Sequence, residues 1–514
     1  MSTSSRQSLI TGAAILTLAG IATRFIGFFY KIFLSHAIGA EGLGIYQLVF
    51  PVYALCFALV ISGIQTAISR CCAAAFAEKK TAKARIYFLS GLLFSFSLSF
   101  LTAFFVYHYA GFISEFFLKE NRCEPLLRLI SFSIPLGTLH TCISAWYYSK
   151  NHTGIPAFSQ LIEQIVRVTS SYILYLIFLE KGLTPSPLLA VAGVLAGEVS
   201  SALFSGICIL FDFQTIFQNV SHKYSLLKSG KELVFLSLPL TANRLLLTIL
   251  QSTESILIPG KLEYSGLSSS QALSIYGILT GMALPFILFP SAITNSVSTI
   301  LLPTISGQQA LGNIQKIRTA TENTIKYCLL LGIFAMGIFF FFGKSVGIVV
   351  YGNEDAGTFI QILSFLCPFL YLTGTLSSIL NGLGHTGLCF LQNAIGLTIR
   401  ILFVMFFIPR FGITGYLWGI LLSQLVITGL NIYFLHRKVD FSFDTFTWII
   451  VPAAALLISC TIGNALLRML NHFTGIPRIL SLLGAMGGCG VIYVGCLLVT
   501  GLFDWKRLRA FSAK

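Results

Sequence analysis

Long apolar runs separated by short polar segments recur along the whole chain. A run of about 20 apolar residues can cross the hydrocarbon core of a bilayer as a helix. Only a helix satisfies the backbone of an isolated span where water is absent. The pattern predicts an all-α polytopic membrane protein with 14 transmembrane helices. They are 8–34, 45–69, 86–109, 125–148, 158–179, 187–211, 233–258, 272–303, 325–350, 358–380, 388–408, 413–435, 445–467 and 478–502.

Two of these spans are unusual. The first is too long for the apolar core of a signal peptide and lacks a small-residue cleavage site, so we expect it to be retained. The span 272–303 is long and contains Pro285, Pro290 and Pro303. Because proline removes a helical hydrogen bond, we expect one kinked helix here and not two spans.

Composition and charge agree with this topology. Of 514 residues, 55% are hydrophobic and 10% are charged, against about 25% charged residues in soluble domains. The net charge of +15 does not indicate nucleic acid, because the basic residues are spread over short loops. With a cytosolic N-terminus, the inner loops and tails hold 18 Lys and Arg residues and the outer loops hold 6. The positive-inside rule then predicts a multi-pass cell-membrane protein with both termini cytoplasmic.

The short loops leave no room for a soluble catalytic domain, and no GxxxxGK[ST] motif for nucleotide phosphates occurs. We therefore expect a transporter and not an enzyme, without a cofactor. The 12 cysteines form no CxxC, and the histidines show no metal-ligand spacing, so no metal site is predicted. Coupling to H+ or Na+ remains an open alternative.

An internal repeat divides the chain. Residues around His152-Thr153-Gly154 match those around His385-Thr386-Gly387 at an offset of 233, which also pairs Arg167 with Arg400. A slightly shorter offset pairs the glycines at 193 and 197 with those at 415 and 419. Two lobes of six helices with the same orientation, and a substrate site between them, are expected. The predicted division is 1–211 for the N-lobe, 212–435 for the C-lobe, and 436–514 for the last two helices and the tail.

Charges inside the spans are the candidate chemistry. Nine basic but only three acidic residues lie within the predicted helices. An arginine at mid-bilayer costs at least ~2.5–3.5 kcal/mol, so it is a functional-site hypothesis by default. The net positive sign favours an anionic cargo. The four arginines deep within spans are Arg24, Arg167, Arg244 and Arg400.

Two polar stripes organise these charges. Gly20, Arg24, Gly27 and Lys31 share one face of the first helix. Arg244, Thr248, Gln251 and Ser255 repeat that spacing on the seventh helix. We predict that the substrate-binding residues of a central cavity are Arg24, Lys31, Arg244, Arg400 and Gln251, with snorkelling to the interface as the alternative for Lys31.

The embedded acids have two interpretations. Glu163 and Arg167 stand four residues apart on one helix, so they form either a structural pair or part of a functional site. Glu198 and Glu254 are candidates either for proton or sodium coupling or for counter-ions of the arginines.

The stretch 238–303 resembles the stage V sporulation protein B family. The likeness is carried by Leu238-Pro239-Leu240-Thr241, Gly281-Met282-Ala283-Leu284-Pro285 and Phe289-Pro290-Ser291, and it extends to the opening stripe. That family belongs to the multidrug, oligosaccharidyl-lipid and polysaccharide exporter superfamily. The resemblance implies a V of two lobes, alternating access, and flipping of polyprenyl-pyrophosphate-linked saccharides for spore cortex peptidoglycan.

The resemblance also bears on the arginines. Arg24 with Gly27 and Phe28 matches the first cavity arginine of the lipid II flippases in this superfamily, whereas their arginines on helices two and eight are absent here. The expected partners are a lipid-linked anionic saccharide, membrane lipids and cell-wall synthesis enzymes, with no nucleic acid. The alternatives are a cation-coupled multidrug exporter on the same scaffold and a non-transporting cell-wall scaffold.

Overall fold

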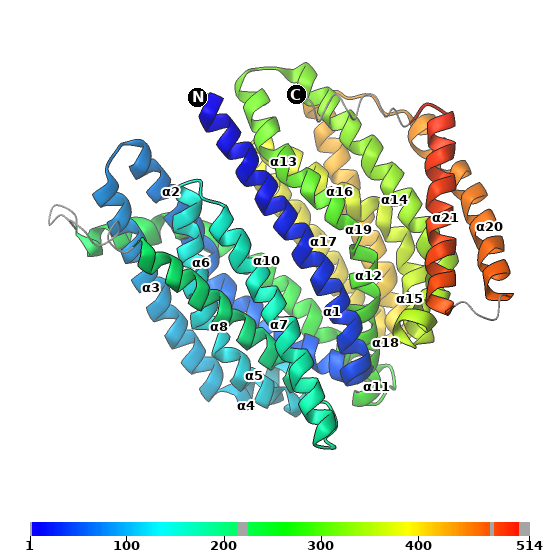
Figure 1. Cartoon of the computed structure of the whole chain (residues 1–514), viewed down its shortest axis with the longest axis horizontal. Coiled ribbons are helices and arrows are strands. Elements are labelled where there is room, and N and C mark those ends of the chain that lie inside the picture. The colour runs from blue at the N-terminus through cyan, green and yellow to red at the C-terminus, as the bar shows by residue number, and fades with distance from the viewer. Residues whose placement is uncertain (1–2, 213–224, 473–476, 503–514) are drawn as a thin grey trace. The chain divides into compact units, whose positions relative to one another are not determined.

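The computed structural model describes residues 3–212, 225–472 and 477–502, and the described residues contain helices and no strand (Figure 1). The chain forms two compact units, residues 1–277 with 404–412, and residues 278–403 with 413–514. Within the described residues, thirteen helices are long and apolar enough to cross a membrane. The first of them, spanning Ala14–Ala77, bends at Gly39 and contains two predicted spans. The prediction of 14 transmembrane helices is therefore confirmed.

The helices of the first unit cover the predicted spans, and they begin and end at somewhat different residues. Gly39 in the first helix has φ 69° and ψ −178°, a conformation that glycine tolerates best. The elements are α1 (Thr3–Phe57), α2 (Gly63–Ala77), α3 (Thr81–His108), α4 (Ala110–Phe112), α5 (Glu124–Ser131), α6 (Ser133–Ser149), α7 (Gly154–Glu180), α8 (Leu188–Phe211), α10 (Leu226–Tyr264) and α11 (Ser269–Gly277), with α18 (Ile408–Phe411).

The second unit begins with the proline-rich segment. Its helices are α12 (Leu284–Leu288), α13 (Ser291–Ala310), α14 (Ile314–Tyr351), α15 (Glu354–Leu363), α16 (Cys367–Gly382), α17 (Thr386–Phe406), α19 (Ile413–Val439), α20 (Val451–His472) and α21 (Arg478–Val499). The predicted span 272–303 is broken into several helical pieces, with Pro290 as the residue before α13. Helices α20 and α21 pack together at one edge of this unit (Figure 1).

Each unit has its own core, and the lipid-facing positions are apolar too. Trp146 and Ile68 are fully buried in the first unit, and Phe342 is fully buried in the second. Large apolar side chains such as Phe104 and Leu101, 66% and 65% exposed, cover the outside. A soluble protein would not expose so much apolar surface, whereas a membrane protein presents it to lipid tails.

The internal repeat is visible in the backbone of its two corners. Asn151 has φ 60° and Gly384, 233 residues later, has φ 83°. The amide of His152 donates to the carbonyl of Tyr147 at 3.0 Å, and the amide of His385 donates to the carbonyl of Leu380 at 3.0 Å. Helices α6 and α16 end at Ser149 and Gly382, again 233 residues apart. The repeated sequence therefore builds the same turn in both units.

The expected lobe boundary between residues 211 and 212 stays a prediction. In the structure, α10 packs against α1, α2 and α3 of the first unit. The contact with α2 is close, because a Cβ at Gly63 would lie 2.9 Å from the backbone nitrogen of Thr241. Ser252 of α10 donates to the carbonyl of Pro51 in α1 at 3.1 Å. Helix α10, which begins at Leu226, thus belongs to the first compact unit.

Candidate functional site

Small residues bring α7 and α8 into close contact in the first unit. Gly193 and Gly197 stand four residues apart on α8, and a Cβ at either position would lie 2.8 Å from a carbonyl oxygen of α7. Small residues at this spacing let membrane helices approach closely. The next residue after this pair is Glu198, so the glycines fix the depth of its carboxylate between the helices.

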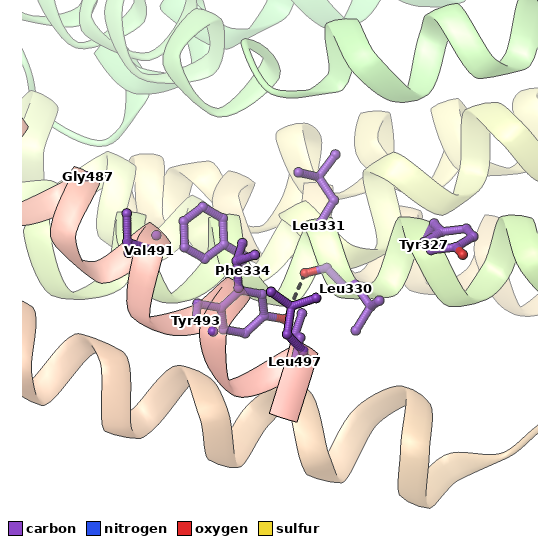
Figure 2. Close-up of a pocket in the computed structure, with 12 residues that line it drawn as sticks. Tyr327, Leu330, Leu331, Phe334, Gly487, Val491, Tyr493 and Leu497 are labelled. Carbon is purple, nitrogen blue, oxygen red and sulfur yellow. Dashed lines mark hydrogen bonds between the residues drawn. The ribbon is translucent and has the colours of Figure 1, made fainter. Parts of the chain in front are cut away.

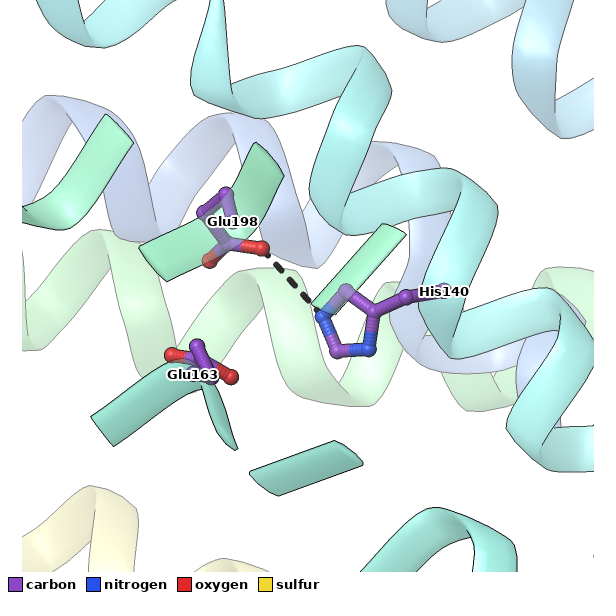
Figure 3. Close-up of side chains that lie close together, drawn as sticks. All are labelled: His140, Glu163 and Glu198. Carbon is purple, nitrogen blue, oxygen red and sulfur yellow. Dashed lines mark ion pairs between the residues drawn. The ribbon is translucent and has the colours of Figure 1, made fainter. Parts of the chain in front are cut away.

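The carboxylate of Glu198 lies at the centre of a buried polar cluster. Tyr53 of α1 donates its hydroxyl to Glu198 Oε1 at 3.1 Å. His140 Nε2 of α6 lies 3.2 Å from Glu198 Oε2. Figure 3 shows these two side chains pointing toward each other, with Glu163 of α7 beside them. We call His140, Glu163, Glu198, Tyr53 and Arg167 the N-unit cluster.

Glu163 is held by the remaining member of the cluster. Arg167 pairs with Glu163 one turn away on α7. One ligand atom from each of His140, Glu163 and Glu198 lies within 4.8 Å of the others. With a neutral imidazole, the two carboxylates exceed the guanidinium by one negative charge. An uncompensated buried charge is costly, so the cluster favours the uptake of one positive charge.

The second unit builds the same packing without these groups. At the repeat offsets, His140, Glu163 and Glu198 correspond to Thr373, Gly396 and Ile420. Ser423 of α19 donates to the carbonyl of Gly396 in α17 at 2.9 Å. The hydroxyls of Thr373 in α16 and Thr428 in α19 are 2.8 Å apart. Three equivalent helices therefore pack together with no ionisable side chain at these positions.

The stripe predicted on the first helix lies on α1 beside this cluster. Arg24 is exposed and Lys31 is half-buried. A Cβ at Gly27 would lie 3.3 Å from the amide nitrogen of Gln164. The Tyr30 hydroxyl lies 2.8 Å from Ser171 Oγ. The glycine and tyrosine contacts hold α1 against α7, the helix that carries Glu163 and Arg167. Among the described residues, no acid pairs with Arg24 or Lys31.

The stripe predicted on the seventh helix lies on α10. Arg244 and Gln251 are exposed, whereas Glu254 is 4% exposed. The Thr248 hydroxyl donates to the carbonyl of Arg244 at 2.8 Å, so it is used within the helix. Arg24 and Arg244 are thus both exposed residues of the first unit. Arg400 is half-buried on α17 and belongs to the second unit.

Sequence reasoning missed two members of the N-unit cluster. His140 and Tyr53 come from helices that are distant in the chain, and no helical spacing links them to Glu198. One available signal was the glycine pair at 193 and 197 directly before a glutamate. The predicted pair of Glu163 and Arg167 is present in the structure. The assignment of cargo-binding roles stays a prediction.

An apolar cavity of about 760 Å³ lies between α14 and α21 in the second unit. Phe334 stacks on Tyr493 with ring centroids 5.0 Å apart. The Tyr493 hydroxyl donates to the carbonyl of Leu330 at 3.0 Å (Figure 2). This bond satisfies one of the two tyrosine hydroxyls of the lining, the other being that of Tyr327. Gly487 and Val491 line the cavity from α21. The cavity suits a hydrocarbon chain.

Comparisons with known proteins agree with this architecture. Residues 9–309 match a family described as polysaccharide biosynthesis protein, and residues 280–483 match one described as lipid II flippase MurJ. Stage V sporulation protein B of Bacillus subtilis strain 168 is 27% identical over 98% of this chain and 98% of its own length. The resemblance predicted from the sequence is confirmed.

Solved structures show the same fold. Lipid II flippase MurJ in an inward closed conformation aligns with a TM-score of 0.72 at 15% identity, covering 95% of this chain and 98% of that chain. An inward-facing multidrug resistance MATE family transporter of the MOP superfamily aligns with a TM-score of 0.62 at 14% identity. That alignment covers 83% of this chain and 98% of the transporter. The fold is that of a multi-pass membrane transporter.

Proposed function

Because the chain belongs to the polysaccharide biosynthesis protein family, we propose that it is a flippase for an anionic polyprenyl-pyrophosphate-linked saccharide. The observation that carries the proposal is Arg24, an exposed guanidinium within a membrane-spanning helix that has no acidic partner among the described residues. Such a charge needs a counter-ion from outside the chain. A lipid pyrophosphate supplies one.

The basic residues bind the cargo in different ways, because guanidinium and ammonium groups differ in geometry. The planar guanidiniums of Arg24 and Arg244 bind phosphate oxygens through two parallel hydrogen bonds. Lys31, two turns from Arg24 and about 10 Å along the helix, acts as a point charge. Gln251 offers an amide to the sugar hydroxyls. Arg400, on α17 of the second unit, stays a predicted cargo ligand.

The lipid tail needs apolar surroundings. We assign them to the cavity between α14 and α21, whose lining includes Phe334 and Val491. Each methylene transferred from water to such a wall contributes about 0.8 kcal/mol. The tail therefore stays in apolar surroundings while the head group crosses.

The transport cycle follows from the charge of the site. With both termini in the cytosol, the inward-open state takes the pyrophosphate onto Arg24 and Arg244. Alternating access then exposes the head group outside. A negative-inside potential favours return of the positive empty site, by about 2.3 kcal/mol per charge for each 100 mV. The likeness to stage V sporulation protein B suggests a peptidoglycan precursor for spore cortex as cargo, delivered to cell-wall synthesis enzymes.

A cation-coupled multidrug exporter is the second candidate. The fold is shared with a MATE family transporter, and the N-unit cluster places two buried carboxylates close together. A cationic drug would need acids on the exposed face. The exposed charges on α1 and α10 that we assign to cargo are basic, which favours the flippase.

Flipping in proteoliposomes tests the proposal. The wild type should move a polyprenyl-pyrophosphate saccharide, and Arg24→Ala and Arg244→Ala should each lower the rate at least tenfold. Lys181→Ala, which removes a positive charge from an exposed turn, is the matched control and should keep the wild-type rate. Full activity of both arginine variants would refute the assignment. Efflux of a cationic dye by the wild type would favour the exporter.

A further inference from the structure

We propose that His140, Glu198 and Glu163 form a proton-binding site, in which His140 Nδ1 accepts the proton. We further infer that this proton is coupled to the transport cycle, a step that rests on the proposed function. The proton comes from water, adds to the lone pair of Nδ1, and breaks no bond in the protein. The site has no equivalent in the second unit, where Thr373, Gly396 and Ile420 occupy the matching positions.

The orientation of the imidazole leaves one nitrogen available. His140 Nε2 lies 3.2 Å from Glu198 Oε2. His140 Nδ1 is buried and has no hydrogen-bond partner among the described residues. In a neutral imidazole whose Nε2 carries the hydrogen, Nδ1 has a free lone pair. The free nitrogen therefore belongs to a ring that already faces a carboxylate, which stabilises the imidazolium.

The charge balance of the N-unit cluster favours a protonated His140 over a neutral one. Glu198 is 5% exposed, and Arg167 is already paired with Glu163. With His140 neutral, the cluster carries one uncompensated negative charge. With His140 protonated, two positive charges match two negative charges. Because charge is costly in a membrane interior, the neutral total is the favoured one.

A proton fits the cluster better than a metal ion does. Ligand atoms of the three residues lie within 4.8 Å of one another, which alone would allow a metal. A metal-bound histidine, however, almost always donates its second nitrogen to a partner, and His140 Nδ1 has none among the described residues. Arg167 also occupies an oxygen of Glu163. The unpartnered Nδ1 and the ion pair of Glu163 with Arg167 both argue against a metal site.

The other helices packed on α6 bring no further charge into contact with His140. Helix α8 contributes Glu198, and α7 contributes Glu163 and Arg167. Tyr53 of α1 is linked to His140 by way of its hydrogen bond to Glu198. Helices α2, α3 and α5 also pack on α6, and no described residue of theirs forms an ion pair with His140. Their charged side chains are Arg70, Lys83, Arg85, Glu124 and Arg128, of which the last two pair with each other at 2.6 Å.

The proton site is mechanically linked to the proposed cargo site. Gln164, the residue after Glu163, lies against Gly27 of α1, one turn from Arg24. The hydrogen bond between Tyr30 and Ser171 closes the same interface on the other side of Arg167. Protonation of His140 changes the attraction that Glu163 and Glu198 exert on Arg167, and so the packing of α1. The proton and the cargo thereby bias the same helix contact.

Direct titration of the imidazole tests the site without transport. We would label the full-length protein with ¹³C,¹⁵N-histidine in nanodiscs and follow the ring signals by NMR from pH 5 to 9. One signal should titrate and be missing from His140→Gln but present in His152→Gln, a control in the exposed corner. In Glu198→Gln the proton affinity of that signal should fall at least tenfold. A His140 signal that does not titrate, or titrates unchanged in Glu198→Gln, would overturn the proposal.

The coupling is tested separately in proteoliposomes. The membrane potential is clamped with potassium and valinomycin, and the rate of flipping is measured with a pH gradient of either sign. The wild type and His152→Gln should change rate at least threefold when the gradient is reversed. His140→Gln should lose this response. A response to a sodium gradient in place of the pH gradient would overturn proton coupling. A wild type that flips no lipid under any condition would refute the proposed function and leave the NMR result to stand alone.

Discussion

Arg167 and Glu163 form an ion pair one helical turn apart in α7, with 21% and 17% of their side chains exposed. The pair neutralises one of the four arginines that lie deep within the predicted spans. Its repeat partner Arg400 has glycine at the position four residues before it. The repeat therefore does not preserve this same-helix ion pair in the second unit.

Removing one partner of this ion pair should destabilise the protein more than removing both. Glu163→Gln removes the carboxylate that Arg167 contacts, and breaking a buried pair typically costs about 3–5 kcal/mol. We expect a clear drop in melting temperature in detergent. Replacing both residues, as Glu163→Leu with Arg167→Met, removes both charges and should recover most of the loss. Equal destabilisation by the single and double variants would contradict a structural pair.

The glycine contact between α7 and α8 should be intolerant of side chains. A Cβ at Gly197 would lie 2.8 Å from the carbonyl oxygen of Glu163, so Gly197→Ala should force the helices apart. Overpacking of this kind costs about 1–3 kcal/mol. Gly206 lies on the same helix with no atom within 4 Å of an added Cβ. Gly206→Ala is the matched control and should be neutral or slightly stabilising. Thermal unfolding of both variants decides the point.

The apolar cavity makes a prediction about chain length. Val491→Trp should fill the space between α14 and α21 and slow the flipping of a long polyprenyl cargo several-fold. A cargo with a short lipid chain should be less affected, because it does not reach the cavity. Val499 is 89% exposed at the end of α21 and does not line the cavity. Val499→Trp should leave both rates unchanged, and equal slowing by the two tryptophans would argue against a tail site.

The two repeat corners make a prediction about backbone strain. Gly384 has φ 83°, so Gly384→Ala should destabilise the second unit by about 1–3 kcal/mol. Asn151 adopts φ 60° at the equivalent position, and Asn151→Gly should be tolerated. Gly387→Ala, in a helix with open space around it, is the control. Unchanged melting of Gly384→Ala would contradict the strained conformation.

Much of the fold was predictable because each span carries its own signal. The length of each apolar run predicts a transmembrane helix. The bend in the first helix lies at a glycine, Gly39. The repeat offset of 233 residues relates the turn at Asn151 to the turn at Gly384. The pair of Glu163 and Arg167 was predictable because helical spacing alone brings the two side chains together.

The centre of the candidate site was not predictable in the same way. His140, Glu198 and Tyr53 meet across three helices, and their contact depends on tertiary packing that no local spacing encodes. Lone histidines and tyrosines in apolar helices carry no sign of their partners. The packing of α10 against α1 and α2 likewise depends on tertiary contacts, and the position of α10 in the internal repeat does not predict it.

We propose that the exposed arginines of α1 and α10 recognise a pyrophosphate in a lipid-linked cargo. The most direct measurement compares flipping of two lipids that share one tail and one saccharide, joined by a pyrophosphate in one and by a neutral linker in the other. The wild type should move the pyrophosphate lipid at least tenfold faster, and Arg24→Ala should lose most of that preference. Equal rates for the two lipids in the wild type would contradict the account.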